Sequence, residues 1–150
     1  MIGADRLHIW CVLWLLTGLT SCKGTSVVEP TLAIDVTRNG AVYQFSFKTC
    51  DNLFGGGAFE VSDVLIFKGF GKPASLPLQC ELVKESPTAR NLPGHWEYAT
   101  TAPGFKMTTC DPLQPGDTYQ VHAGAGASNG RRVFTVKENG DVVMGQSSCH

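Results

Sequence analysis

The stretch Leu113-Gln114-Pro115-Gly116-Asp117-Thr118-Tyr119-Gln120-Val121 decides the fold of this 150-residue chain. Pro115-Gly116 predicts a turn, because proline fixes its own φ angle and glycine accepts positive φ. Tyr119 and Val121 then alternate with polar residues, as in a strand that is buried on one face. The stretch therefore predicts a turn that leads into a β-strand, with Leu113 and Tyr119 packed in the core.

Similar alternation recurs along the chain and predicts further strands near residues 31–36, 42–47, 59–68, 76–83, 94–99 and 132–136. Asn39-Gly40 predicts a hairpin between the first two of these strands. Asn129-Gly130 predicts a turn before the strand at 132–136, and Asn139-Gly140 predicts a closing hairpin with residues 141–144. Faltering alternation near Ser62-Asp63 predicts a β-bulge, and residues 105–107 are interpreted as an extension of the strand at 94–99. Beyond residue 22, no stretch sustains apolar residues at helical spacing for three turns.

The stretch 113–121 resembles the tyrosine corner of fibronectin type III domains. In that corner a tyrosine hydroxyl bonds to upstream backbone where the chain crosses between two sheets. The resemblance runs from about Pro30 to Val136 and implies that Leu113, Gly116 and Tyr119 form the corner. It implies an all-β fold over residues 30–150, an immunoglobulin/fibronectin-III-like β-sandwich of about seven strands plus a C-terminal hairpin. The chain departs from that family in lacking a tryptophan in the second strand and in carrying several cysteines.

At the other end of the chain, an apolar run from Ile9 to Leu19 follows a single basic residue, Arg6. The run is too short to span a membrane and is typical of a secretory signal peptide. It closes on Leu19-Thr20-Ser21-Cys22, which resembles the lipobox of bacterial lipoproteins. An ordinary secretory peptide, cut after Thr20 or Ser21, is the alternative.

The lipobox resemblance implies that residues 1–21 are removed and that Cys22 receives a diacylglycerol and a further acyl chain such as palmitate. Residues 22–29 then form a lipidated tether to the domain at 30–150. Lys23 stands where lipoproteins of the inner membrane typically carry aspartate. The resemblance thus predicts a lipid-anchored protein of the cell envelope, at the outer membrane rather than the inner one.

Six cysteines occur in the chain, of which Cys11 leaves with the signal peptide and Cys22 carries the lipid. The remaining four, in an exported protein, predict two disulfides. A simple antiparallel order of strands predicts the pairs Cys50–Cys80 and Cys110–Cys149, because each pair then lies at one end of the sandwich. The two other connectivities stay open.

Residues that carry catalytic or metal chemistry do not form a recognisable pattern in this sequence. Gly55-Gly56-Gly57 lacks the Lys-Ser/Thr of a phosphate-binding loop, and Cys149-His150 lacks a second pair of metal ligands. His95 and His122 each stand alone, no nucleophile elbow appears, and no carboxylates form a facing pair. We therefore predict no catalytic residues, no cofactor and no metal site, and a protein that is not an enzyme.

The net charge of −1, without a basic stripe, argues against a nucleic-acid partner. We predict instead a non-catalytic interaction module that contacts a protein partner of the envelope through the loops of the sandwich. The candidate loops are Cys50–Gly57 with Ala123–Asn129 at one end, and Gly69–Pro73 with Pro103–Gly104 at the other. The alternative is an inhibitor or immunity-type protein that blocks an envelope hydrolase with one stiffened loop; catalysis, involving a residue such as His122, has the least support.

Overall fold

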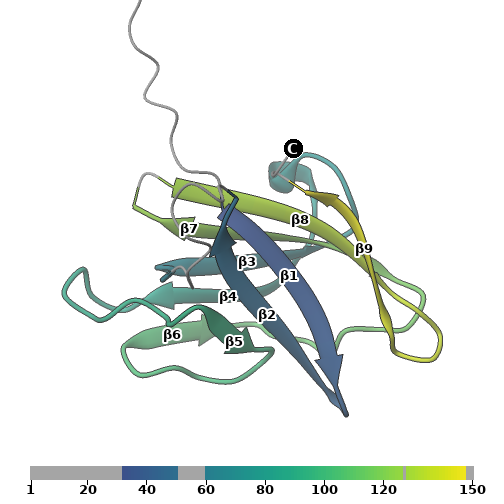
Figure 1. Cartoon of the computed structure of the whole chain (residues 1–150), viewed down its shortest axis with the longest axis horizontal. Coiled ribbons are helices and arrows are strands. Elements are labelled where there is room, and N and C mark those ends of the chain that lie inside the picture. Colours follow the sequence, from purple (N-terminus) through teal and green to yellow (C-terminus); the bar gives the residue numbers. More distant parts are fainter. Residues whose placement is uncertain (1–31, 51–59, 127, 148–150) are drawn as a thin grey trace, which may run out of the picture.

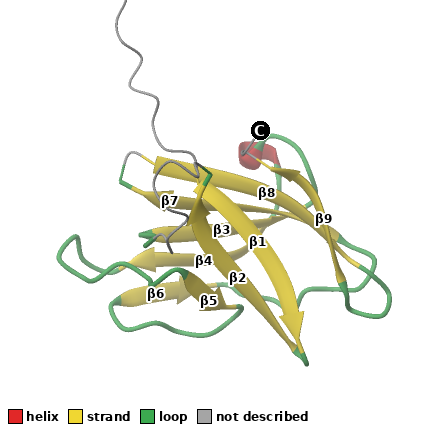
Figure 2. Cartoon of the chain, in the orientation of Figure 1, coloured by secondary structure: helices red, strands yellow, loops and turns green. Residues whose placement is uncertain are grey.

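The computed structural model describes residues 32–50, 60–126 and 128–147, which fold as two antiparallel β-sheets facing one another (Figure 1). The smaller sheet has the strand order β1-β2-β5 and the larger one the order β6-β4-β3-β7-β8-β9. The predicted all-β, sandwich-like fold is confirmed (Figure 2). The predicted signal peptide and tether, the lipidation site Cys22, Cys149 and the triple-glycine loop lie outside the described residues.

The strands differ in length from three to nine residues. They are β1 (Leu32–Asn39), β2 (Val42–Thr49), β3 (Asp63–Lys68), β4 (Leu78–Lys84), β5 (His95–Glu97), β6 (Phe105–Thr108), β7 (Thr118–Ala125), β8 (Ser128–Val136) and β9 (Val142–Ser147), with a 3-10 helix, η2 (Pro73–Ser75), before β4. The described residues contain no helix of the length and apolarity that crossing a membrane requires. Both hairpins predicted from Asn39-Gly40 and Asn139-Gly140 are confirmed, as β1–β2 and β8–β9.

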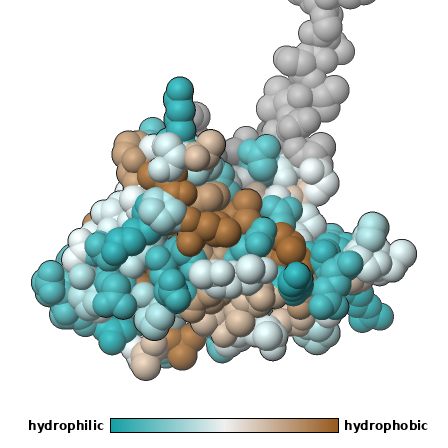
Figure 3. Space-filling view, turned by 180° about the vertical axis from the view of Figure 1, so that it is seen from behind, coloured by the Kyte–Doolittle hydropathy of each residue, from teal (hydrophilic) through white to brown (hydrophobic). Residues whose placement is uncertain are grey.

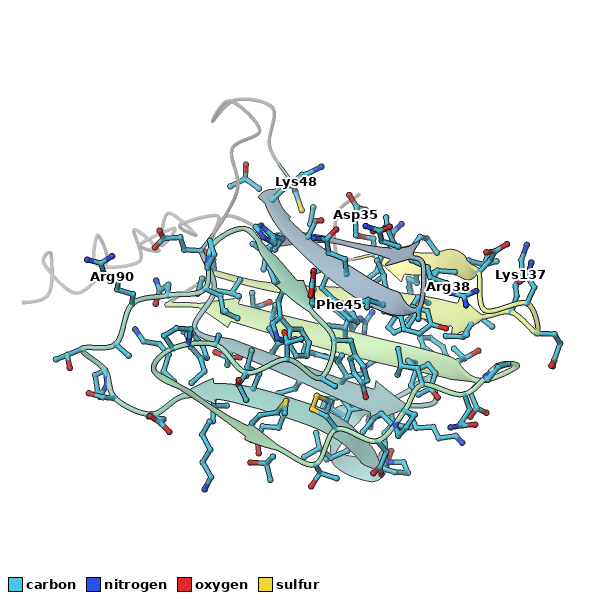
Figure 4. All side chains as sticks on the ribbon, turned by 90° about the horizontal axis from the view of Figure 1, so that it is seen from below. Asp35, Arg38, Phe45, Lys48, Arg90 and Lys137 are labelled. Carbon is cyan, nitrogen blue, oxygen red and sulfur yellow. A yellow bond between two sulfur atoms is a disulfide. The ribbon has the colours of Figure 1, made fainter. Side chains whose placement is uncertain are left out.

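The core lies between the two sheets and is built from the alternate residues that the sequence pattern selects. Phe45 of β2 is fully buried there (Figure 4), and its ring meets the edge of the Phe134 ring from β8 at 5.7 Å between centroids. Leu32, Ile34 and Val36 of β1 are also buried. On the opposite side of the same hairpin, exposed Asp35 and Lys48 form an ion pair of 4.0 Å. Burial of one face and solvation of the other is what period-two alternation produces.

The stretch 113–121 leads the chain into β7. Tyr119 is fully buried, and its hydroxyl oxygen accepts a hydrogen bond of 2.8 Å from the backbone N–H of Gln114. Gly116 has φ +83°, and its N–H donates to the carbonyl of Val136 at 2.7 Å. Leu113 is buried as well. These contacts fasten the segment before β7 to the end of β8.

The turn predicted at Asn129-Gly130 is wrong, because both residues lie inside β8, where Gly124 faces Asn129 and Ala123 faces Gly130. The chain turns earlier, between the paired residues Ala125 and Ser128. A Cβ atom at position 130 would collide with the carbonyl oxygen of Leu32. Glycine is therefore needed at 130 for the close approach of β1 to β8, not for a turn.

The predicted disulfide pairing is also wrong, because Cys80 is bonded to Cys110. The reason is the pairing of β6 with β4, in which Thr108 faces Glu81 and the following residues run alongside the start of β4. Residues 105–108 thus join the larger sheet instead of extending β5. Cys50 is disulfide-bonded too, but its predicted bond to Cys80 is excluded because Cys80 is bonded to Cys110.

The irregularity predicted near Ser62-Asp63 lies elsewhere. Val61 forms an isolated bridge with Leu92, and β3 begins two residues later at Asp63. The register shift between β3 and β4 falls between Ile66 and Phe67. The faltering alternation therefore marks a change of pairing partner before β3.

Candidate interaction surface

Loops gather at two ends of the sandwich, which we name after an exposed residue in each. The Arg90 end carries residues 85–94, residues 102–104 and the turn after Ala125; the Phe70 end carries residues 69–77, 114–117 and 137–141. The predicted grouping of Pro103–Gly104 with Gly69–Pro73 is wrong. Gly104 lies at the Arg90 end, where its carbonyl accepts a 3.0 Å hydrogen bond from the N–H of Glu85. The cause is again β6, which begins opposite Lys84.

Residues 85–94, the Arg90 loop, project from the Arg90 end, with the exposed Arg90 side chain pointing away from the sheets (Figure 4). Lys84 fastens the loop from beneath, because its Nζ donates to the carbonyl of Pro87 at 3.4 Å and to Oδ1 of Asn91 at 2.9 Å. The loop also closes on itself, with the N–H of Ala89 donating to the carbonyl of Ser86 at 3.0 Å. Arg90 is thus presented by a loop with internal support.

The loop is also supported from its far side by residues 102–104. A Cβ atom at Gly104 would lie 2.9 Å from the Cβ atom of Ala89, so the two backbones are in close contact there. Gly104 has φ +78°, a conformation that favours glycine. The close contact at Gly104 therefore limits how far the Arg90 loop can move toward the sandwich.

A depression of about 620 Å³ lies on the outer face of the larger sheet. It is lined by residues of β3, β7, β8 and β9, among them Asp63, His122, Asn129, Arg131 and Gln146. Leu65, His122 and Arg131 face one another in one row across three strands. The lining offers an acid, a base and amides, which suits a polar side chain of a partner better than an apolar ligand.

His122 lies on the outer face, as its alternation with Val121 predicts, and is half-buried. The N–H of Gly71 donates to Oε1 of Gln120 at 3.4 Å, so the amide nitrogen of Gln120 is the donor in its 2.6 Å hydrogen bond to Nε2 of His122. This arrangement requires a neutral imidazole that accepts at Nε2. Burial, followed by the charge of Arg131, lowers the pKa of His122. The ring of Phe67 meets His122 at 5.7 Å.

Other residues that the sequence singles out are separate from this row. His95 is exposed on β5, and Trp96 is buried with its Nε1 donating to the carbonyl of Thr100 at 2.9 Å. Tyr98 donates to the carbonyl of Asp111 at 2.6 Å, and burial above all raises its pKa to about 12. Within residues 32–50, 60–126 and 128–147, no cluster of three or more His, Cys, Asp or Glu side chains could hold a metal ion.

The Arg90 loop was not recognisable in the sequence as a candidate contact. Residues 85–93 are polar and bounded by prolines, which predicts a loop but not that it projects or that Lys84 supports it. No protein-family model, curated protein or solved structure matches the chain.

Proposed function

We propose that the protein is a lipid-anchored lipoprotein of the bacterial cell envelope that acts as a non-catalytic protein-binding module. The observation that carries the binding role is the Arg90 loop, which presents an exposed arginine from a supported backbone. Arginine is enriched at protein interfaces and among the residues that dominate their affinity. Support within the free protein lowers the entropy lost on binding. The depression lined by Arg131 on the larger sheet supplies a second polar contact.

The location rests on the resemblance of Leu19-Thr20-Ser21-Cys22 to a lipobox. Two or more acyl chains hold a protein stably on a membrane, because each buried CH₂ contributes about 0.8 kcal/mol. Lys23 favours the outer membrane over the inner one. The mass of the processed N-terminus tests this directly: we expect an acylated Cys22, and a Cys22→Ser protein without acyl chains. An unmodified Cys22 in the processed wild-type protein would show that the anchor is wrong.

The strand order supports a place among fibronectin-like sandwiches. In immunoglobulin-type sandwiches the third, sixth and seventh strands share one sheet and the first two share the other with the fifth. Here β3-β7-β8 and β1-β2-β5 are neighbours in this way, and the larger sheet has three further strands, β4 and β6 beyond β3 and β9 beyond β8. Such domains place recognition on loops at the sandwich ends, where the Arg90 loop lies.

An inhibitor or immunity-type protein is the second candidate, and the same loop favours it. A projecting, internally bonded loop can enter the active-site cleft of an envelope hydrolase without ordering on binding. The two candidates differ in what is bound. A module of a larger assembly retains several envelope proteins, whereas an inhibitor retains one hydrolase and abolishes its activity.

Affinity purification from detergent-solubilised envelopes tests the binding role. We would compare the wild type with Arg90→Ala and with Lys137→Ala, which removes an exposed cation at the Phe70 end. We expect Arg90→Ala to weaken capture of the partner about tenfold or more, as interface arginines do, and Lys137→Ala to leave it unchanged. Equal loss in both variants, or in neither, would mean that the Arg90 loop is not the contact. Capture of a single hydrolase that the wild-type protein inhibits would favour the inhibitor over the interaction module.

A further inference from the structure

Phe70 is the most exposed large apolar side chain of the described residues, with 61% of its surface accessible. It stands in the run Lys68-Gly69-Phe70-Gly71-Lys72 between β3 and η2. Both flanking glycines have positive φ, +101° at Gly69 and +150° at Gly71. A phenylalanine between two glycines and two lysines is thus exposed in a turn whose backbone conformation favours glycine on both sides of it.

The backbone around Phe70 is fixed to the larger sheet. The N–H of Gly69 donates to the carbonyl of Thr118 at 2.7 Å, and the N–H of Gly71 donates to Oε1 of Gln120 at 3.4 Å. Leu76 occupies the space beneath, where its Cδ2 would lie 3.3 Å from a Cβ atom at Gly69. Because the space below the loop is filled, Phe70 is directed outward.

The charge near Phe70 favours an anionic surface. No acidic residue occurs between Asp63 and Glu81, while Lys68 and Lys72 both lie in that interval. Lys68 is paired with Asp117 at 2.5 Å. Lys72 is exposed and forms no ion pair with any described residue. The two charged side chains of residues 64–80 are thus both basic, and an exposed cation beside an apolar side chain is the pattern that anionic lipid headgroups attract.

Figure 3 shows the molecule from behind the view of Figure 1, with apolar residues gathered near the middle of the visible face and hydrophilic residues around them. Leu78, at the start of β4, is 40% exposed and pairs with Phe67, three residues before Phe70. A second exposed apolar side chain therefore lies close to the end of β3.

We propose that residues 68–72, the Phe70 loop, are a second membrane contact, in which Phe70 enters the headgroup region and Lys72 lies beside anionic phosphates. The inference rests on the proposed function for the presence of a membrane close to the domain. Alone, one aromatic side chain and one free cation bind lipid weakly. Tethering makes the contact intramolecular, so that even a weak interaction is populated.

The tether is long enough for this contact. Leu32 touches Gly130, which pairs with Ala123, and from there β7 runs five residues to Thr118, beside Gly69. Five strand residues span about 17 Å, so Leu32 lies on the order of 20–30 Å from the Phe70 loop. The ten steps from Cys22 to Leu32 extend to at most about 35 Å. Cys22 and Phe70 can therefore be in the same membrane.

Two substitutions that each add one tryptophan test the contact in the processed protein reconstituted into vesicles that contain anionic lipid. Phe70→Trp places a reporter in the loop, and Val42→Trp places a matched one at a 40% exposed site at the start of β2. The unsubstituted protein is subtracted, since Trp96 is buried. We expect Trp emission at 70 to shift to shorter wavelength and to be quenched by lipids brominated near the headgroups. The emission at 42 should stay as in solution.

The charge is tested by adding Lys72→Gln to Phe70→Trp. Removing one cation near an anionic surface should weaken the loop contact about fivefold, seen as a loss of quenching that also follows from raising the salt concentration. Unchanged emission at position 70, or equal quenching at 70 and 42, would overturn the proposal. So would protection of position 70 that requires an added envelope protein in place of lipid.

Failure of the anchor would be distinguishable from failure of this contact. The mass of Cys22 reports the anchor, whereas quenching at position 70 reports the loop, and an unacylated protein can be mixed with vesicles at high lipid concentration. Quenching without acylation would support the loop contact and contradict the anchor. Acylation without quenching would support the anchor and contradict the loop contact.

Discussion

The two faces of the larger sheet bury their residues by different means. On β7, Tyr119, Val121 and Ala123 point inward and are covered by the facing sheet. Gln120 points outward and is equally buried, because residues 69–77 fold over it and bond to it through Gly71. The inner face is therefore dictated by alternation along each strand, whereas the outer face depends on a loop from another part of the chain.

The largest expected effect concerns the inner face, where Cys80 is fully buried in its bond to Cys110. Cys80→Ala together with Cys110→Ala opens a loop closed over a sequence separation of 30 residues. The chain-entropy model gives a loss of about 3–4 kcal/mol in the free energy of unfolding. Urea denaturation measures it. Peptide mapping without reduction is the control, and a peptide that links Cys50 to Cys80 would contradict the pairing.

The second prediction also concerns the inner face of the larger sheet, because the distance between β1 and β8 determines how closely the smaller sheet covers that face. Gly130→Ala drives a methyl group into the carbonyl of Leu32. Overpacking against backbone should lower the free energy of unfolding by about 2–3 kcal/mol. Gly40→Ala is the control: it meets nothing within 4 Å, and its φ of +63° costs about 1 kcal/mol. Equal losses in both variants would mean that β1 does not contact β8 as described.

Tyr119→Phe tests the same face through the hydrogen bonds of one hydroxyl group. The ring stays in the core against Phe134, but the N–H of Gln114 loses its acceptor and Oδ2 of Asp117 loses a donor at 3.5 Å. Gln114 is exposed, so water can partly replace the hydroxyl. The expected loss in the free energy of unfolding is about 1–2 kcal/mol. Tyr43→Phe, which removes a longer hydrogen bond of 3.2 Å to the carbonyl of Gly140, is the comparison. A loss at Tyr119 within the error of denaturation would show that its hydroxyl does not stabilise the corner.

The sequence predicts what depends on neighbours along the chain. The hairpin at Asn39-Gly40 and the burial of Leu113 and Tyr119 follow from local turn chemistry and alternation. The pairing of β6 with β4 does not, because residues 105–108 form a short strand whose partner is more than 20 residues away. Asn129-Gly130 has the residues of a turn, but both lie in a strand. Gly130 is instead needed for the close approach of Leu32, which the sequence does not predict.

The same limit applies to the candidate surface. The alternation with Val121 places His122 on the outer face. The Arg90 loop could not be found in this way, because its projection depends on Lys84 bonding to Pro87 and Asn91 and on Gly104 packing behind Ala89. Such contacts join segments that show no shared pattern. Loop composition predicts that a loop exists, and only the fold determines what it presents.

The smallest expected effect concerns the outer face and its dependence on pH. The pKa of His122 is lowered in the folded protein, by burial first and by Arg131 second. Between that pKa and the ordinary value of about 6.5, the unfolded chain binds more protons than the folded one. The free energy of unfolding should therefore fall as pH drops below about 6.5 and recover above it.

The hydrogen bonds that Gln120 forms with His122 and Gly71 indicate which part of the fold should respond to pH. A protonated His122 can no longer accept from the amide of Gln120, and if that amide turns its oxygen toward the imidazolium, its nitrogen faces the N–H of Gly71. Other charged groups near the ring are Asp63 on β3, which lines the same depression, and Glu81 on β4, which lies across Leu65. Protonation should thus loosen residues 69–77 before it affects the inner face.

His122→Gln tests this assignment, because its amide oxygen reaches the position of Nε2 and can still accept from Gln120 but does not titrate. We expect the variant to lose less stability than the wild type between pH 7 and pH 5, with His95→Gln, at an exposed histidine on β5, following the wild type. Hydrogen exchange at pH 5 and pH 7 locates the change: faster exchange at low pH should be confined to Gly69 and Gly71 in the wild type and absent in His122→Gln. Exchange that rises equally at Tyr119 and Val121 would show that the two faces of the sheet open together. It would contradict the claim that protonation loosens residues 69–77 before it affects the inner face.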